Sequence, residues 1–574
     1  MASSAPRLAD VESAFPAADV VIDQLAELAI SDPGRRTVFR RAMSLLGVVR
    51  HCEKTRLRMI ALAKQGINPF DQETIDPIFK VLYPELSFSG VMEDGDNNPF
   101  VRAGKLVYAT LQGKDEARDN TARESHLYGR TVALYRRGLG LRKRFVDNAK
   151  SETIVVATAG RFYEVRVYEN GRPLSPGRLT ATFQAIAADA QSHPEDSGHG
   201  ALTGFVDRGT LAAVHDNPHD EGIRRIDSAL FLLALDLDAA PEDIGALGSQ
   251  IHIGGYCNRD YRKALQLVVC GNGKAGAVFS LFAGVEGVTG ARFLSAIANV
   301  AAALPKGADL AAPAPFTVIG LRAYPELTRK AAVRLESAMA TAAYSHRIDA
   351  IGKDRIKALG VSPDAFLHTA VHLAYKRHFG RTPEAYNFID LSTQQFGSIS
   401  RYPCTTETLR RFLEEPTRAN LLAAFAAHKE AIAETRRGNH PLHYAYHYVF
   451  ASPGIMALVA ILLFTALIPR FNSRFLLPDL WMSNIPASPG LVSMCRHGMT
   501  LGFVRRQAYT CHYLLFPDHI RVNVSAREEA DLEAWPVQEG LQEAFRTLEA
   551  ILKDDRRQTI RTAASDPVGS AAAN

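Results

Sequence analysis

The chain has 574 residues, which is too long for a single hydrophobic core and predicts two or more domains. Hydrophobic residues make up 47% and charged residues 22% of the sequence, the proportions of an ordinary soluble globular protein. The net charge of +5 is small for this length, so composition gives no support for a nucleic-acid-binding protein.

The cysteines and the first residues bear on the cellular compartment. Six cysteines are scattered along the chain without a C-x-x-C pair, which indicates neither a zinc knuckle nor a disulfide scaffold. The start, "MASSAPRLADVESAF", lacks a basic segment followed by an apolar one, so no secretory signal is predicted. We therefore expect a cytoplasmic protein.

Helices are predicted for most of the first 150 residues, where "RRTVFRRAMSLLGVVRHCEKTRLRMIALAKQG" has apolar residues at three- and four-residue spacing. Strands follow in "TIVVATAG" and "RFYEVRVY", with turn chemistry at Asn170-Gly171. The apolar run Ser228 to Asp236 predicts a strand buried on both faces. Another hairpin, "KALQLVVCGNGKAGAVFS", is predicted to turn at Asn272-Gly273.

The second part of the chain alternates helices and strands again. Residues 362–380 show a helical period, with Ser362 as N-cap, Pro363 in the first turn and Gly380 as C-cap. The strands "AYTCHYLLF" and "HIRVNVSA" precede a last helix, "LQEAFRTLEAILK". These patterns together predict an α/β chain with mixed sheets.

One apolar segment, residues 455–468, needs a separate interpretation. Its 14 residues fall short of the ~20 that a helix needs to cross a bilayer. We predict a buried helix and no transmembrane segment, with shallow peripheral membrane contact as the alternative.

Several words in these elements resemble the choline/carnitine acyltransferase family. "IVVATAGRFYEVRVYENGRPLSP" is similar to its first sheet hairpin, and "NRDYRKALQLVVCGNGKAG" to its N-R-W-x-D-K-S-L-Q-x-I-V word. "IGKDRIKALGVSPDAFLHTAVHLAYKRHFG" is similar to the family's G-K-x-x-x-K word, its S-P-D-A-F word and the long helix that follows. The resemblance runs from about Thr153 to about Lys553 in the same order.

The resemblance implies two chloramphenicol-acetyltransferase-like halves, each a mixed β-sheet covered by helices, with an active-site tunnel at their interface. Residues 1–90 are then expected to form an N-terminal helical region that packs on the body. Residues 91–310 and 311–555 would form the two halves, and residues 556–574 a disordered tail. Acyl-CoA would be a substrate, with no cofactor held by the protein.

The family's catalytic motif, H-x-x-x-D/E-G, is altered in "VFSLFAGVEG". Glu286 and Gly287 match its last two letters, which puts Phe282 at the place of the catalytic His. Counting forward from Gly276 puts Leu281 there instead. Neither side chain titrates, so base catalysis from this position is excluded. Glu286 is an alternative base, because burial can raise a carboxyl pKa, although its family counterpart is a structural partner for an Arg.

The acceptor side departs from the family as well. The word G-R-T-E/D-T-I-R-S reads "GSISRYPC" from Gly397 to Cys404, and Pro403 stands where an Arg would bind a carboxylate. The family's Ser-Thr-Ser motif, whose hydroxyls help to hold the oxyanion, reads "SNI" here and keeps one hydroxyl, that of Ser483. Ser525 is a second oxyanion candidate. Carnitine is therefore not the expected acceptor.

The coenzyme side is better preserved. Lys353 and Lys357 match the lysines that meet the phosphates of coenzyme A, and Asp364 matches the acid beside the pantetheine. The competing interpretation is that both lysines are solvent-facing charges of a polar loop.

Two histidine groups could suggest a metal. His440, His443 and His447 include a pair four residues apart but lack an acidic third ligand, and His368 and His372 fit polar packing on the long helix. We predict no metal site.

Two functions of different class remain open. The first is an acyl-CoA-dependent acyltransferase with a non-carnitine acceptor, for example an amine, which attacks a thioester with less help from a base, or a more lipophilic molecule. The second is a catalytically inactive member that binds acyl-CoA or a protein partner.

Overall fold

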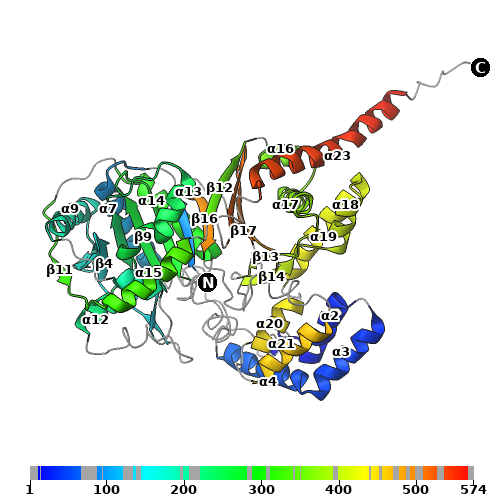
Figure 1. Ribbon diagram of the computed structural model, residues 1–574, viewed down its shortest axis with the longest axis horizontal. Helices are drawn as coiled ribbons and strands as arrows, with labels where there is room; N and C mark the ends of the chain where they lie inside the picture. The colour runs from blue at the N-terminus through cyan, green and yellow to red at the C-terminus, as the bar shows by residue number, and fades with distance from the viewer. Residues whose placement is uncertain are drawn as a thin grey trace, which may run out of the picture.

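The computed structural model contains two large β-sheets flanked by helices, with a further group of helices beside the second sheet (Figure 1). The structure describes residues 11–12, 14–30, 32–65, 87–92, 95–119, 134–137, 144–193, 198–205, 220–280, 287–305, 311–339, 343–349, 351–391, 399–437, 441–450, 455–468, 478–485, 491–497, 509–526 and 535–565.

The first sheet has eight strands in the order β11-β5-β4-β8-β9-β10-β1-β16. The pairs β4–β8 and β8–β9 are parallel and the others antiparallel, so the predicted mixed sheet is confirmed. The strands are β1 (Ser87–Met92), β4 (Thr153–Thr158), β5 (Arg161–Arg166), β8 (Leu232–Asp236), β9 (Leu265–Cys270), β10 (Ala275–Ser280), β11 (Phe316–Ile319) and β16 (Leu491–His497).

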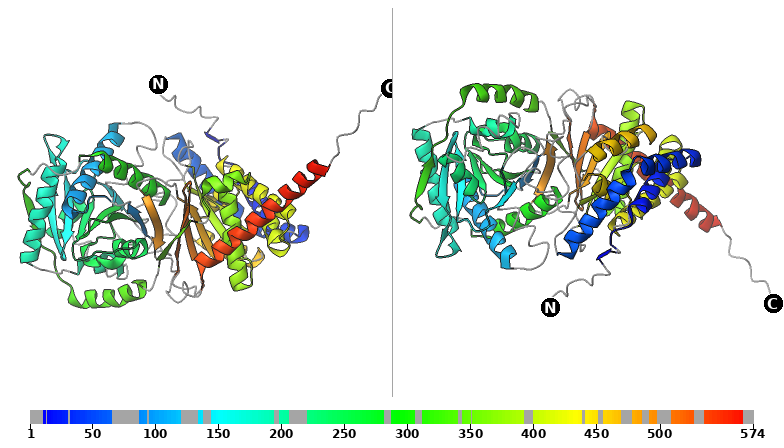
Figure 2. Two further views of the ribbon diagram at one scale, coloured as in Figure 1. Left: turned by 90° about the horizontal axis from the view of Figure 1, so that it is seen from above. Right: turned by 90° about the horizontal axis from the view of Figure 1, so that it is seen from below.

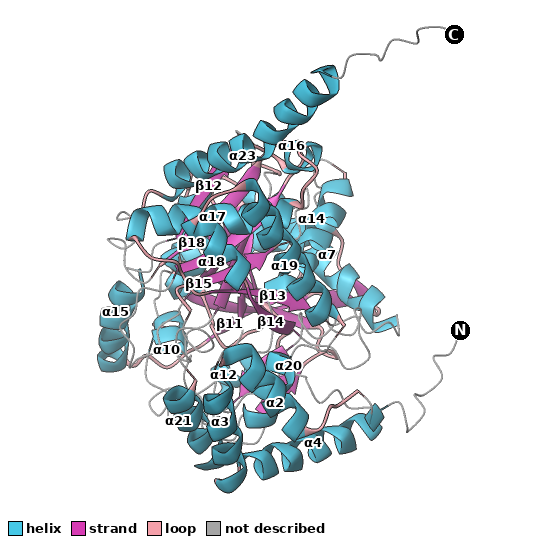
Figure 3. Ribbon diagram, turned by 90° about the vertical axis from the view of Figure 1, so that its right-hand side faces the viewer, coloured by secondary structure: helices cyan, strands magenta, loops and turns pink. Residues whose placement is uncertain are grey.

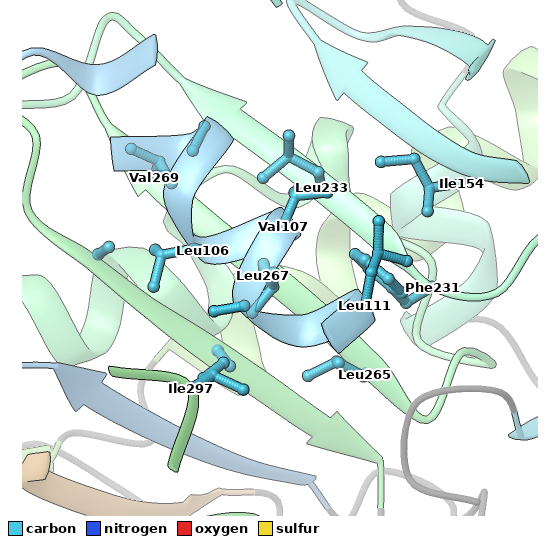
Figure 4. Close-up of a cluster of buried hydrophobic side chains, with 14 of the residues drawn as sticks. Leu106, Val107, Leu111, Ile154, Phe231, Leu233, Leu265, Leu267, Val269 and Ile297 are labelled. Carbon is cyan, nitrogen blue, oxygen red and sulfur yellow. The ribbon is translucent and has the colours of Figure 1, made fainter. Parts of the chain in front are cut away.

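Both faces of this sheet are buried. On one face Leu233 packs with Leu106 and Val107 of helix α7 (Figure 4), and on the other its neighbour Leu232 packs with Leu247 of α13. The continuous apolar run predicted to be a doubly buried strand therefore forms one. The helices of this half are α7 (Pro99–Asp119), α9 (Pro176–Ser192), α10 (His199–Phe205), α12 (Glu221–Ser228), α13 (Ile244–Ser249), α14 (Gly287–Ala303) and α15 (Pro325–Met339).

The second sheet has six strands in the order β12-β18-β17-β15-β13-β14, with β13, β15 and β17 parallel. The strands are β12 (Ala343–Ile348), β13 (Ala385–Asp390), β14 (Ile399–Pro403), β15 (Leu480–Asn484), β17 (Tyr509–Leu515) and β18 (Ile520–Ser525). Its helices are α16 (Lys353–Ala358), α17 (Pro363–Phe379), α18 (Glu407–Glu414), α19 (Arg418–Arg436) and α23 (Val537–Ser565).

Helix α17 is the long helix of the second half, and its ends match the prediction. The Ser362 hydroxyl accepts a hydrogen bond from the Ala365 backbone N–H, and Pro363 lies in the first turn. Gly380 ends the helix with φ 68°, a left-handed conformation that costs glycine nothing.

Strand β16 joins the two halves. It comes from the second half of the chain but pairs with β1 in the first sheet. Its Ser493 hydroxyl also donates to the Asn523 Oδ1 of β18 at 2.8 Å. The two sheets therefore meet along β16, at the junction visible in Figure 2. Strand β11 also lies beyond the predicted boundary at residue 310 yet belongs to the first sheet.

The group of helices beside the second sheet (Figure 3) combines distant parts of the sequence. It consists of α2 (Ala18–Ala29), α3 (Pro33–Leu45), α4 (Val48–Lys64), α20 (Pro441–Phe450) and α21 (Ile455–Leu467). Within α21, Phe464 is buried and Leu462 is 61% exposed. No helix in the described part of the chain is long and apolar enough to cross a bilayer. Shallow membrane contact stays a prediction.

The remaining elements are short, apart from the end of α23. Helix α23 runs to Ser565 and projects from the body (Figure 1), so the predicted disordered tail does not begin at residue 556. Helix-forming Arg, Gln and Ala in residues 556–565 favour this continuation. The other elements are β2 (Leu134–Arg137), β3 (Arg144–Asp147), β6 (Tyr168–Glu169), β7 (Arg172–Pro173), a π-helix (Gln250–Gly254) and a 3₁₀-helix (Tyr256–Asn258).

Candidate functional site

Asp364, in the first turn of α17, is the centre of a partly buried hydrogen-bond network. Its Oδ2 accepts from His428 Nε2 of α19 at 2.8 Å. Its Oδ1 accepts from Asn484 Nδ2 of β15 at 2.9 Å and from the Tyr513 hydroxyl of β17 at 2.5 Å. One carboxylate therefore holds two helices and two strands together.

The surroundings of Asp364 favour its charged form. Burial alone would raise the pKa of its carboxyl, but the hydrogen bond from His428, the two nearby imidazoles and the Tyr513 hydroxyl lower that pKa below its ordinary value. Burial also lowers the pKa of His368 well below the usual range, so its ring is neutral at pH 7.

The network continues to the Asn387 side chain on β13. The Asn387 Oδ1 accepts from the Phe388 backbone N–H, so its Nδ2 is the donor. This Nδ2 lies 2.9 Å from His368 Nε2 and 3.0 Å from the Tyr402 hydroxyl. These contacts link strand β13 to the side chains around Asp364.

The same residues include side chains that can bind metal ions. Asp364, His368 and His428 are the group of ligand-capable side chains that the described residues bring together, with ligand atoms within 4.8 Å of one another. Carboxylate and imidazole can bind Zn²⁺, but here they already hydrogen-bond to each other or to Tyr513. His443 and His447, the other group considered in the sequence, lie on α20 with ring centroids 4.7 Å apart, and His440 is outside the described residues.

Lys353 and Lys357 lie one helical turn apart on α16, directly before α17. Neither forms an ion pair within the described part of the chain, whereas Arg355 between them binds Glu549 of α23 at 2.9 Å. Their i, i+4 spacing puts the two ammonium groups on one side of the helix and Arg355 on the other.

The position of α16 is fixed by its backbone. The Lys353 N–H donates to the Phe516 carbonyl at 2.8 Å. A Cβ on Gly352 would lie 2.3 Å from the backbone of Pro517, so only glycine fits.

Ser483 and Ser525 lie on the opposite face of the second sheet from the helices. Met482 of β15 belongs to the core under the helices, whereas Ile485 belongs to the core of the first half. Because successive side chains of a strand alternate, Ser483 points toward the first half. On β18 the same alternation places Ser525 there, since Val524 packs in the helix-covered core.

Other polar residues share this face, which we call the inter-half face. Sequence reasoning singled out the two serines but missed their neighbours, because it predicted both segments only as strands and assigned no faces to them. All of these side chains are buried, and the signal available was period-two alternation of polar residues in the two strands: Thr510, His512, Arg521, Asn523 and Ser525.

Part of the predicted site lies outside the described residues. Phe282, Leu281 and Glu286 lie outside the described residues, between β10 and α14. Asp364 and Ser483 are brought to the same end of β15, because Asn484, the next residue, bonds to Asp364. They lie on opposite faces of the sheet.

Comparisons with known proteins identify the family of this chain. The Choline/Carnitine o-acyltransferase family model matches residues 80–535. The human "Carnitine O-palmitoyltransferase 2, mitochondrial" is 26% identical over 297 residues, which cover 48% of this chain and 44% of that protein. The yeast Saccharomyces cerevisiae "Carnitine O-acetyltransferase, mitochondrial" is 22% identical over 225 residues, covering 36% of this chain and 33% of the relative.

The chain thus spans less than half the length of these relatives in the matched regions. Among solved structures, a wax ester synthase/diacylglycerol acyltransferase from Marinobacter aquaeolei VT8 aligns with 83% of this chain and 99% of its own, at 12% identity and a TM-score of 0.35. The predicted cytoplasmic location stays a prediction. Since the family model covers most of the sequence, this chain belongs to the choline/carnitine O-acyltransferase family.

Proposed function

We propose that this chain transfers an acyl group from coenzyme A to an acceptor other than carnitine. The observation that carries the proposal is the pair Lys353 and Lys357, two cations on one side of α16 that no acidic side chain of the described residues neutralises. Phosphate groups suit such a pair, because ammonium groups are compact donors that adapt to a mobile phosphate. Acyl-CoA is then a substrate, and the protein holds no further cofactor.

The acceptor side supports a different acceptor. Pro403, at the position of the family's Arg, ends strand β14 and has no donor for a carboxylate. Arg401, two residues earlier, has its guanidinium 5.9 Å from the centroid of the Trp481 ring. The Trp481 ring thus offers an aromatic surface beside β14, close to the Arg401 cation. An amine or a more lipophilic acceptor fits the Trp481 ring and Pro403 better than a zwitterion does.

Coenzyme binding is tested by calorimetry on the purified full chain with acetyl-CoA and longer acyl-CoAs. We expect Lys353→Glu/Lys357→Glu to weaken binding at least about tenfold, because two favourable contacts with phosphate become repulsive. Arg355→Ala is the matched control, since it removes a cation from the other side of the same helix. Equal affinity in all three proteins would contradict the coenzyme site.

A measurement of turnover distinguishes an active acyltransferase from an inactive protein that only binds acyl-CoA. Thiol release from acyl-CoA is followed with panels of amines and alcohols. Acyl transfer to any of them supports the proposal. Binding of acyl-CoA without thiol release would instead favour the inactive binder, to which the Phe282 replacement points.

A further inference from the structure

We propose that His512 is the general base of this chain. This inference rests on the acyl transfer proposed above, and it supplies a proton acceptor from the second half. The imidazole is 3% exposed and lies in the middle of strand β17.

The alternation of β17 places His512 between the two sheets. Cys511 and Tyr513 pack in the core under the helices, whereas Leu514 belongs to the core of the first half. The ring centroid of His512 lies 6.1 Å from that of Phe88, which is on strand β1 of the first sheet. The imidazole therefore lies at the junction of the halves.

The two neighbouring strands place complementary groups beside this imidazole. In register, His512 is opposite Ser483 of β15 on one side and Asn523 of β18 on the other. Side chains at such positions share a face and are about 5 Å apart. Asn523 Oδ1 accepts from Ser493, so its buried Nδ2 is a donor, and this atom has no hydrogen-bond partner in the described structure.

An imidazole flanked by a hydroxyl and an amide N–H is the set that acyl transfer requires. The imidazole can take a proton, and a donor on either side of it, Ser483 or Asn523, can hold the oxyanion that forms on the thioester carbonyl. Two other histidines of this half have structural partners on the helix-covered face. His346 lies 3.3 Å from Gln538, and His372 bonds to Thr405.

The proposed step is balanced in atoms and charge. His512 takes the proton of the acceptor's O–H or N–H while the acceptor atom bonds to the thioester carbon. The tetrahedral intermediate then collapses, the carbon–sulfur bond breaks, and the proton passes from the imidazolium to the leaving thiolate. The products are the acylated acceptor and free coenzyme A.

The experiment compares wild type, His512→Ala, His512→Gln and the control His346→Ala. Thiol release is measured with amines, with alcohols and with water alone, and acyl-CoA affinity is measured by calorimetry. We expect both His512 variants to lose at least about 100-fold in turnover while acyl-CoA affinity changes less than about twofold. Added imidazole should restore part of the turnover of His512→Ala and none in the control.

The outcomes separate this inference from the proposed function. Unchanged turnover in His512→Gln, or lost turnover that imidazole does not restore in a folded His512→Ala, would overturn the base and leave acyl transfer standing. Acyl-CoA binding without thiol release in the wild-type protein would overturn both acyl transfer and the base, while the coenzyme site stands. Circular dichroism and thermal unfolding check that each variant is folded.

Discussion

The two faces of the second sheet use buried polar residues differently. On the helix-covered face, Asp364 is bound by three side chains of this chain, and the network tightens the core. On the inter-half face, polar side chains line a junction between halves, and the Nδ2 of Asn523 lacks a partner in the described structure. Buried polar groups that their own chain satisfies stabilise the fold. Buried nitrogens without a partner occur on both faces, His368 Nδ1 on the first and Asn523 Nδ2 on the second, but only the second face meets the other sheet. The same sheet thus has a structural side and a side suited to chemistry.

The largest expected effect on stability is at Asp364. Asp364→Ala would leave the donors of His428, Tyr513 and Asn484 without their acceptor, and should lower the free energy of unfolding by about 3 kcal/mol or more. Urea unfolding followed by circular dichroism measures this loss. A loss below about 1 kcal/mol would show that the network does not hold the helices and strands together.

The pH dependence of stability tests whether Asp364 is charged in the folded protein. The folded state lowers the pKa of Asp364, so its contribution is complete above the ordinary Asp pKa and is lost as pH falls toward the folded value. Wild type should therefore lose stability on acidification below about pH 4 more steeply than Asp364→Asn. Parallel pH profiles of the two proteins would contradict a charged Asp364 in the network.

A change on the inter-half face should cost less stability. Asn523→Ala removes one hydrogen bond, that from Ser493, and we expect a loss of about 1 kcal/mol in the free energy of unfolding. Thiol release should fall much more than this loss implies, because the amide also lies beside His512. If Asn523→Ala costs as much stability as Asp364→Ala and leaves turnover unchanged, the contrast between the faces is wrong.

The smallest effect is expected outside both faces. Arg355→Ala breaks an ion pair with Glu549 in which the Arg side chain is half exposed, and such pairs contribute about 0.5 kcal/mol or less. Urea unfolding should therefore give nearly the wild-type value. A loss above about 1 kcal/mol would mean that the attachment of α23 depends on this contact.

Much of the architecture could be predicted from the sequence, because it depends on local pattern. The caps of α17, the doubly buried strand β8 and the turn at Gly273 follow from hydrogen-bonding side chains, apolar runs and glycine conformations that each act over a few residues. The family also followed from words in order, and the family model confirms it. The disordered tail was predicted to begin at residue 556, whereas helix α23 continues through residues 556–565.

Tertiary structure decided which residues meet. No local pattern pairs β16 with β1, because that contact joins segments about 400 residues apart in the sequence and depends on the packing of both halves. The same holds for the partners of Asp364, which come from α19, β15 and β17. The sequence by itself determined most of the elements and the family, and it predicts the loss of the usual base. Only the folded chain put His512 beside Ser483 between the two sheets.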